Sequence, residues 1–281
     1  MNRALLSRLL PDAEPERLTV REGQFHRVVV GPDRVVCLPR TEAAAARLPH
    51  RAAVLRLLAG FDLGFRTPRP LLEGGARDAD GPPFLVLSRV PGASLEAGAL
   101  EDPRFAEAAA AQYVTLLAEL ARVGAEERVR AALPAPRDRW RRFAADVRAE
   151  VFGLMSDGGR RRAERELAAL GGLPSVTSAV VHGDLGPENV LWERDGGLPV
   201  LGGVIDWDEV TIGDPAEDLA AVGAGYGGGF LDRVLRLGGW PDGTLATRIA
   251  VIRATFALQQ ALSALRDGDE EQLADGLAGY R

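Results

Sequence analysis

The chain has 281 residues, of which 46% are hydrophobic and 26% are charged, and its formal net charge is −6. This composition excludes a disordered chain, and the length suffices for one large domain or two lobes around a cleft. The negative charge argues against a surface that binds nucleic acid. The single cysteine, Cys37, excludes an intrachain disulfide.

The first elements are predicted to be a short helix followed by strands. Residues 1–16 form an amphipathic pattern without the apolar core or cleavage site of a signal peptide. Valine-rich stretches at 18–22, 25–31 and 34–40 are typical of strands, and residues 41–60 are typical of a helix that Pro49 divides. No apolar run is long enough to span a membrane, so we expect a cytoplasmic protein with no membrane partner.

From residue 84 onwards the pattern changes from strands to helices. Residues 84–90 predict a buried strand that ends at Pro91. Helical periodicity follows at 103–124, 137–154 and 157–170, then strands return within 178–206, and 214–281 are again helical. We predict an α+β protein with a small β-rich lobe at 1–90, a hinge at about 87–92, and a larger, mostly helical lobe at 91–281.

A polar loop interrupts two apolar runs at VVHGDLGPENVLW, residues 180–192. Asp184 and Asn189 have the five-residue spacing of the kinase catalytic loop, H-R-D-x-x-x-x-N. A carboxylate can orient a hydroxyl group and accept its proton, while carboxylate and amide oxygens are ligands for Mg²⁺. This spacing therefore indicates phosphoryl transfer.

Two later segments fit the same chemistry. Asp206 ends an apolar strand in IDWDEV, after a predicted β-hairpin, which is the position of the metal-binding Asp in the kinase DFG segment. In GDPAEDLA, Asp214 is a good helix N-cap, Pro215 a good first residue, and Glu217 completes a capping box. A helix start is the preferred interpretation of this segment, and a second one is that it braces the loop.

The motifs HGDLGPEN, IDWDEV and GDPAEDLA resemble those of the aminoglycoside phosphotransferase family. The resemblance implies a bilobal protein-kinase-like fold, with ATP and Mg²⁺ as cofactors. Gly183 follows this family, since protein kinases have Arg there. Further segments resemble those of family members directed at tuberactinomycins, namely GQFHRVVV, FLVLSRVPG and the C-terminal segment. This resemblance implies that the phosphoryl acceptor is a cationic cyclic peptide antibiotic, viomycin or capreomycin. The short N-terminal segment favours capreomycin.

The resemblance also implies roles for individual residues. Asp184 would be the catalytic residue, Asn189 and Asp206 would hold the metal, and His182 with Asp214 would support the loop. The nucleotide would meet a turn over the phosphates and the hinge strand. These positions are Gln24, Phe25 and His26 in the turn, and Leu87, Ser88 and Val90 in the hinge.

The sequence departs from the kinase pattern where a lysine and a glutamate are expected. Cys37 stands at the lysine position and Arg51 at the glutamate position, and the chain contains no lysine. One hypothesis is that Arg51 reaches across the small Cys37 and clamps the phosphates. Arg21 and Arg40 are rivals for this role, and the alternative is that Arg51 points to solvent. Cys37 itself is expected to be a small buried strand residue.

Acceptor binding is expected to involve acidic side chains, and Asp208 and Glu209 are the preferred candidates. Trp207 either stacks on a guanidine group or, preferably, packs in the core. Residues 255–265 predict an apolar helix face in the core or at a dimer seam, so the chain is a monomer or a homodimer. The alternatives are a kinase of the same fold for an aminoglycoside or other small alcohol, and a pseudokinase-like protein that binds a ligand without catalysis.

Overall fold

The computed structural model describes residues 3–11, 13–14, 18–23, 26–75, 82–240 and 243–281. Contacts divide the chain into a first unit, Met1–Ala99 with Glu188–Asp208, and a second unit, Leu100–Pro187 with Glu209–Arg281. The first is built on a β-sheet and the second is mostly helical, which confirms the predicted fold class. The predicted boundary at residue 90 differs from this division, because residues 91–99 and 188–208 belong to the first unit.

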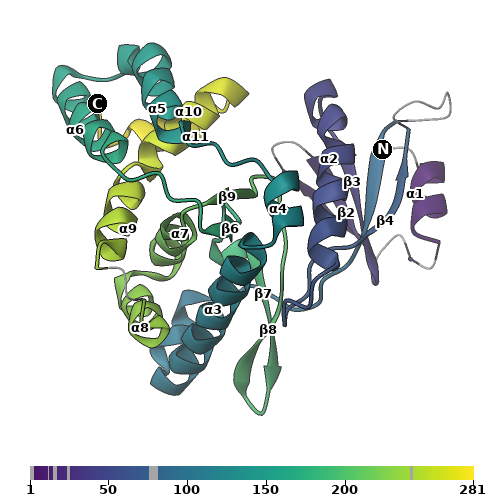
Figure 1. Ribbon diagram of the computed structural model, residues 1–281. Helices are drawn as coiled ribbons and strands as arrows, with labels where there is room; N and C mark the ends of the chain where they lie inside the picture. Colours follow the sequence, from purple (N-terminus) through teal and green to yellow (C-terminus); the bar gives the residue numbers. More distant parts are fainter. Residues whose placement is uncertain (1–2, 12, 15–17, 24–25, 76–81, 241–242) are drawn as a thin grey trace. The chain divides into compact units, whose positions relative to one another are not determined.

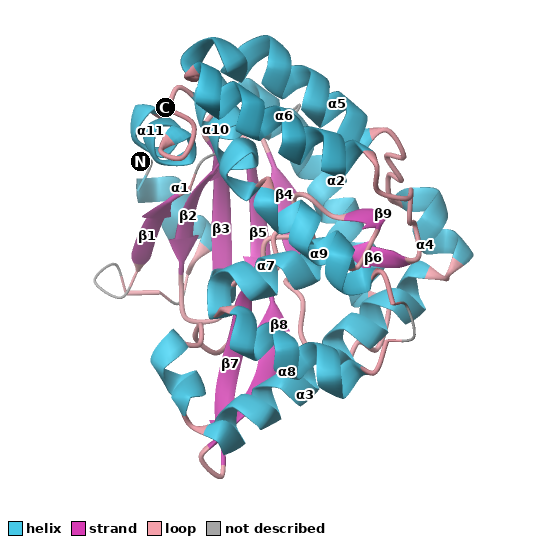
Figure 2. Cartoon of the chain, turned by 90° about the vertical axis from the view of Figure 1, so that its left-hand side faces the viewer, coloured by secondary structure: helices cyan, strands magenta, loops and turns pink. Residues whose placement is uncertain are grey.

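The sheet of the first unit has five antiparallel strands in the order β1-β2-β3-β5-β4 (Figure 2). Its strands are β1 (Thr19–Glu22), β2 (His26–Val30), β3 (Arg34–Pro39), β4 (Pro70–Gly74) and β5 (Phe84–Ser88). The sequence pattern did not predict β4. This strand begins with a proline and lies at an edge, where a missing backbone N–H is tolerated, and it exposes Leu71 and Leu72.

Helix α2 (Glu42–Ala59) contacts β3, β4 and β5 (Figure 1). The prediction that Pro49 divides this helix is wrong, since α2 is continuous. Pro49 is exposed, while Ala44, Leu48 and Ala52 on either side of it are buried. Burial of this face stabilises the helix and offsets the loss of the backbone hydrogen bond that proline removes.

Helix α1 (Arg3–Leu9) confirms the predicted N-terminal helix and belongs to an apolar cluster with the sheet. Its leucines pack in one cluster with alternate residues of β2, β3 and β5, as the two-residue period of strands requires. The cluster consists of Leu5, Leu6, Leu9, Leu10, Val29, Val36, Phe84 and Val86.

The hairpin of β7 (Val190–Asp195) and β8 (Leu198–Val204) completes the first unit. Gly196 and Gly197 have φ angles of 55° and 83°, as a tight two-residue turn requires. Bridges join Gly203 to Arg66 and Trp192 to Ala93. These bridges explain why the hairpin belongs to the first unit although it lies late in the sequence.

The second unit contains a short sheet among helices. Strands β6 (Ala179–Val181) and β9 (Thr211–Gly213) pair antiparallel, and α3 contacts β6. The helices are α3 (Pro103–Gly124), α4 (Glu127–Ala132), α5 (Arg139–Asp146), α6 (Asp157–Gly171), α7 (Ala216–Tyr226), α8 (Gly228–Gly238), α9 (Leu245–Ala254), α10 (Phe256–Asp267) and α11 (Glu270–Leu277). A π turn at Val147–Val151 follows α5, and a 3₁₀ turn at Phe152–Leu154 follows it; two further 3₁₀ turns, at Ala97–Glu101 and Pro187–Asn189, lie where the chain passes between the units.

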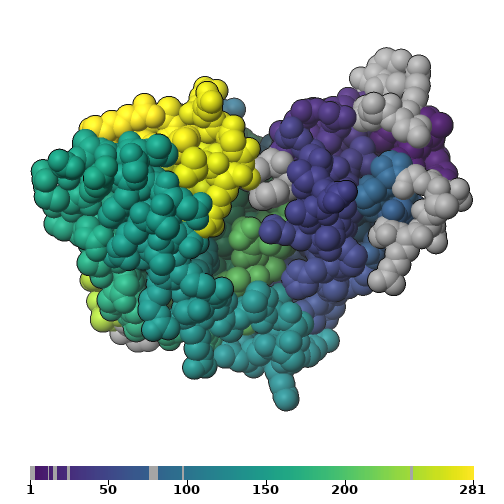
Figure 3. Space-filling view, turned by 90° about the horizontal axis from the view of Figure 1, so that it is seen from above, coloured from purple at the N-terminus to yellow at the C-terminus, as the bar shows by residue number. Residues whose placement is uncertain are grey.

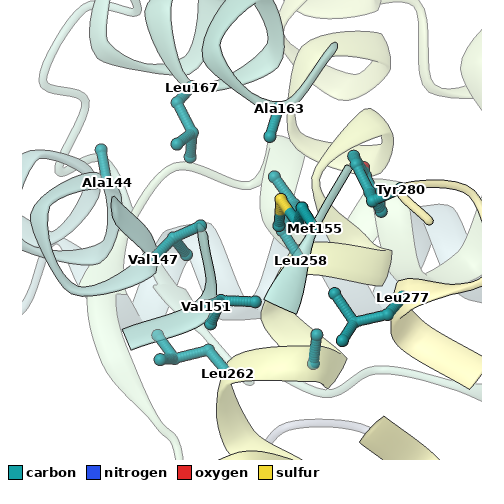
Figure 4. Close-up of a cluster of buried hydrophobic side chains, with 11 residues drawn as sticks. Ala144, Val147, Val151, Met155, Ala163, Leu167, Leu258, Leu262, Leu277 and Tyr280 are labelled. Carbon is teal, nitrogen blue, oxygen red and sulfur yellow. The ribbon is translucent and has the colours of Figure 1, made fainter. Parts of the chain in front are cut away.

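The C-terminal helices enclose an apolar core with α5, the π turn and α6 (Figure 4). On the surface, the yellow C-terminal segment lies against the teal middle of the chain (Figure 3). Leu258, Ala261 and Leu262 of α10 lie in this core, which confirms the predicted burial of this helix face. The penultimate residue, Tyr280, is 1% exposed, and its carbonyl oxygen accepts a hydrogen bond from the Ser156 N–H. Within the described ranges, every helix is too short or too polar to cross a membrane.

Candidate active site

The loop after β6 is held by a buried carboxylate of the second unit. The backbone N–H groups of His182 and Gly183 donate hydrogen bonds of 2.9 and 3.0 Å to the two carboxylate oxygens of Asp218 in α7. Asp218 is 1% exposed, and burial raises its pKa to about 7 although both hydrogen bonds act in the opposite direction. One side chain therefore fixes the backbone directly before Asp184.

Gly183 occupies a position that a larger residue could not share. Its φ angle is 89°, and a Cβ atom there would lie 2.9 Å from the Glu209 carbonyl oxygen. A left-handed backbone and a close approach to another segment both favour glycine. This is a physical reason for glycine, rather than the arginine of protein kinases, at this position.

His182 and Asp184 differ in exposure. The imidazole of His182 is fully buried, and its Nδ1 accepts a 3.2 Å hydrogen bond from the Asp184 N–H. This contact supports the predicted structural role of His182 in the loop. Asp184 is exposed, while the next residue, Leu185, is fully buried and anchors the chain after it.

The role predicted for Asp214 in the loop is performed by Asp218. Asp214 instead accepts a hydrogen bond from the Ala216 N–H at the start of α7, and forms a buried ion pair with Arg248, at 2.6 Å. Asp214 therefore contacts the start of α7 as predicted, but α7 begins at Ala216 and its N-cap residue is Pro215 rather than Asp214. Glu217 forms an ion pair with Arg139, and burial raises the pKa of Glu217.

The first unit brings the two predicted metal ligands to one end of the β7–β8 hairpin. Val190 pairs with Val204, and the N–H of Ile205 donates a 2.9 Å hydrogen bond to the Asn189 carbonyl oxygen. Asn189 is 6% exposed, whereas the Asp206 side chain is 51% exposed. Asp206 has a φ angle of 64°, the one positive value outside glycine in the described ranges. Such strain is often found at functional sites.

Arg51 lies inside a polar cluster of the first unit and does not point to solvent, so that alternative is wrong. Its side chain is 13% exposed. The guanidinium Nε lies 2.9 Å from an Asp208 carboxylate oxygen, and Nη2 lies 3.6 Å from an Asp206 carboxylate oxygen. Nη1 is 3.3 Å from Nδ1 of His26. The cluster thus joins α2, β2 and the segment after β8.

Burial keeps two neighbours of this cluster, His26 and Cys37, uncharged. Burial and the Arg51 charge lower the pKa of His26 to about 4, so Nδ1 of the neutral ring accepts from Arg51. Burial raises the pKa of the Cys37 thiol to about 11, against the opposite effect of Arg51. Cys37 is 2% exposed on β3, in agreement with the predicted small strand residue.

The predicted nucleotide-binding residues divide into several groups. Gln24 and Phe25 lie outside the described residues. Leu87 and Val90 are buried. The backbone N–H of Ser88 donates to the Arg69 carbonyl oxygen at 2.8 Å, and its hydroxyl accepts from the Arg69 N–H at 2.9 Å. The Ser88 N–H is therefore engaged within the sheet.

The IDWDE segment contains one core residue between acidic ones. Trp207 is 2% exposed, and its indole N–H donates to the Val204 carbonyl oxygen at 3.0 Å, which confirms the core interpretation. Asp208 and Glu209 are both exposed as whole residues, but Asp208 is the ion-pair partner of Arg51 and its side chain is 24% exposed. The two predicted acceptor-binding residues therefore have different surroundings.

Two contributions to the site were not predicted from the sequence. Asp218 was not among the predicted site residues, and Asp208 was predicted only as an acceptor-binding residue. The available signal for Asp218 was its place four residues after Asp214, between Glu217 and the apolar Leu219 and Ala220. A carboxylate beside buried helix positions is expected to need a partner.

Comparison with known proteins supports the resemblance. Residues 19–248 match the phosphotransferase enzyme family. Viomycin phosphotransferase of Streptomyces vinaceus is 67% identical over 281 residues, which cover 100% of this chain and 98% of that protein. A structure of APH(2")-IIIa with GDP and kanamycin has a TM-score of 0.81 at 22% identity, covering 98% of this chain and 95% of the other.

A second structure, a ternary complex of APH(2")-IIa with streptomycin and ATP, has a TM-score of 0.72 at 15% identity, with coverage of 99% and 95%. At such identities these two likenesses concern the fold alone. The family match covers most of the chain, and the identity with viomycin phosphotransferase extends over all of it. The chain therefore belongs to the phosphotransferase enzyme family that includes the aminoglycoside phosphotransferases, and it is a phosphotransferase.

Proposed function

We propose that this enzyme moves the γ-phosphoryl group of ATP to a hydroxyl group of a tuberactinomycin antibiotic, viomycin or capreomycin. The observation that carries the proposal is the 67% identity with viomycin phosphotransferase over the whole chain. The reaction would inactivate a cationic cyclic peptide and would take place in the cytoplasm. Asp208 and Glu209 are the acidic residues first expected to bind the acceptor, and the exposed Glu209 remains the candidate.

Asp184 is the proposed catalytic residue, as the group that orients the acceptor hydroxyl and accepts its proton. Three observations support it: the exposed carboxylate, the HGD motif, and the rigid support that Asp218 and His182 give to the loop. Positioned proton acceptors contribute about 10²–10⁴-fold to rates. The expected role of the buried His182 is to hold the loop.

Asn189 and Asp206 are the proposed residues for Mg²⁺. An amide and a carboxylate at the same end of the hairpin fit the oxygen ligands that this ion prefers. Bound Mg²⁺ would neutralise negative charge on the nucleotide phosphates. Arg51 is the proposed phosphate clamp, and Val90, whose backbone follows the engaged Ser88, is the proposed contact for the adenine edge.

The test is a transfer assay with purified protein, ATP and Mg²⁺, in which viomycin, capreomycin and kanamycin are offered separately. Mass spectrometry should show the addition of one phosphoryl group to viomycin or capreomycin. Asp184→Asn is the matched variant, since it keeps the size of the side chain but removes the carboxylate; it should lower kcat by about 10²-fold or more. Transfer to kanamycin alone would contradict the proposed acceptor, and no transfer to any of the three would contradict the function.

A further inference from the structure

Arg51 and Asp208 form an ion pair at the place where protein kinases have a lysine–glutamate pair. In kinases the cation is on the third strand and the anion on the helix. In this chain the strand carries Cys37, the cation is on α2, and the anion follows the β7–β8 hairpin. The cation therefore stands on the helix instead of the strand, and a carboxylate outside both of these elements completes the pair.

The guanidinium of Arg51 retains hydrogen-bonding capacity. Of its five N–H groups, the part of the chain that the structure describes satisfies one by a hydrogen bond, that of Nη1 to His26. Nε is buried and lies close to Asp208, but its N–H is not aligned for a hydrogen bond to it. Buried donors without acceptors are rare in proteins, and a planar guanidinium with spare donors suits a phosphate group.

Asp208 is the carboxylate that best fits the function of holding Arg51. It lies 2.9 Å from the guanidinium, against 3.6 Å for Asp206, and its side chain is 24% exposed, against 51% for Asp206. Asp206 is also the proposed metal ligand. The shorter and better-shielded pair is thus formed by a residue that has no proposed role at the metal.

We propose that Asp208 is a positioning residue, which holds Arg51 in the orientation that binds the nucleotide phosphates. This inference rests on the proposed function, because that function identifies the phosphate groups bound by Arg51 as those of a nucleotide. It replaces the earlier assignment of Asp208 to the acceptor. An Asp208 that binds the antibiotic would change acceptor affinity, whereas an Asp208 that orients Arg51 changes nucleotide affinity.

The first experiment measures binding of ADP with Mg²⁺ by calorimetry, without an acceptor, in a double-mutant cycle. Arg51→Ala and Asp208→Asn are each expected to weaken nucleotide binding about tenfold or more, since a hydrogen bond to a charged group contributes about 1.5–3 kcal/mol and 1.4 kcal/mol is tenfold. The double variant should bind about as weakly as Arg51→Ala alone, because Asp208 acts through Arg51. If the fold-losses of ADP affinity in the two single variants multiply in the double variant, the inference is overturned.

The control pair is on the same helix. Arg56 of α2 forms an ion pair with Glu73, and their side chains are 56% and 33% exposed. Arg56→Ala and Glu73→Gln should leave ADP binding unchanged. Asp208→Glu, which keeps the charge, should restore at least part of the affinity lost in Asp208→Asn; an Asp208→Glu variant that is folded, as judged by its thermal transition, but no better than Asp208→Asn would contradict a role of the carboxylate charge.

Steady-state kinetics separates the two proposals. In Asp208→Asn the KM for ATP should rise about tenfold while the KM for the antibiotic changes less than twofold. The reverse result would overturn the positioning role and return Asp208 to the acceptor site. If wild-type protein binds ADP and shows the expected cycle but transfers no phosphoryl group, the proposed function fails while the inference about Arg51 and Asp208 stands.

Discussion

Replacement of Asp218 by asparagine tests how the catalytic loop is held. Asparagine has nearly the same shape, but it can accept only one of the two backbone hydrogen bonds from His182 and Gly183. Its amide group would face the second N–H. We expect kcat to fall about tenfold, because the backbone before Asp184 loses a fixed position.

The same substitution has a calculable effect on stability as a function of pH. The pKa of the Asp218 carboxyl group is raised from 3.8 to about 7 by burial. The folded chain therefore keeps a proton that the unfolded chain releases, so this contribution is fully present below pH 3.8 and is lost as pH rises to about 7. At about 1.36 kcal/mol per pH unit, over a rise of about 3 units, the loss is on the order of 4 kcal/mol.

The assay is urea denaturation of wild-type protein and Asp218→Asn at several pH values between 4 and 8. The difference in free energy of unfolding, wild type minus variant, should decrease up to pH about 7 and then stay constant. The pKa of Glu217 is also raised, but Glu217 is present in both proteins, so its contribution to the difference in free energy of unfolding largely cancels. Asp232→Asn is the control, since Asp232 is exposed on α8. A difference that does not vary with pH would refute the reasoning.

Further predictions concern the free energy of unfolding, measured by urea denaturation. Gly183→Ala should cost about 1–3 kcal/mol more than Gly196→Ala, since both have a positive φ but only Gly183 would place Cβ 2.9 Å from a carbonyl oxygen; equal losses would show that the close approach is unimportant. Arg248→Met leaves the buried Asp214 carboxylate without its ion-pair partner and should cost about 3–5 kcal/mol. Arg66→Met, which breaks an exposed ion pair, should cost less than about 1 kcal/mol. Similar losses in the two variants would contradict the role of burial. Leu258→Ala, at 0% exposure, should cost about 2–5 kcal/mol, and a loss below 1 kcal/mol would mean that the core of Figure 4 collapses around the missing side chain.

The sequence predicted the elements that carry the HGD and IDW motifs because their signals are local. A short buried strand, a polar loop, and a hairpin with two adjacent glycines can each be recognised within about ten residues. The continuous α2 helix was not predicted, because the cost of Pro49 is local but the burial that offsets it depends on the tertiary fold. The edge strand β4 escaped prediction for the same reason.

The partners of charged residues could not be predicted from the sequence. Asp208 stands in a run of acidic residues, and its pairing with Arg51 joins segments that are distant in the chain. Asp218 stands beside apolar helix positions, but the sequence does not show that its partners are the backbone N–H groups of the loop. In each case the residue type was visible, whereas the contact that determines its role depends on how elements distant in sequence meet.

The buried Cys37 gives this chain a built-in reporter of opening motions. It is the one cysteine, it is 2% exposed on β3, and its thiol has a pKa raised to about 11, so in the closed sheet it should react slowly with thiol reagents. The rate of labelling then measures how often the sheet of the first unit opens. Arg51, the proposed phosphate clamp, acts electrostatically on the Cys37 thiol. If nucleotide binds at this proposed site, it should slow labelling, so that ligand occupancy could be followed without any turnover.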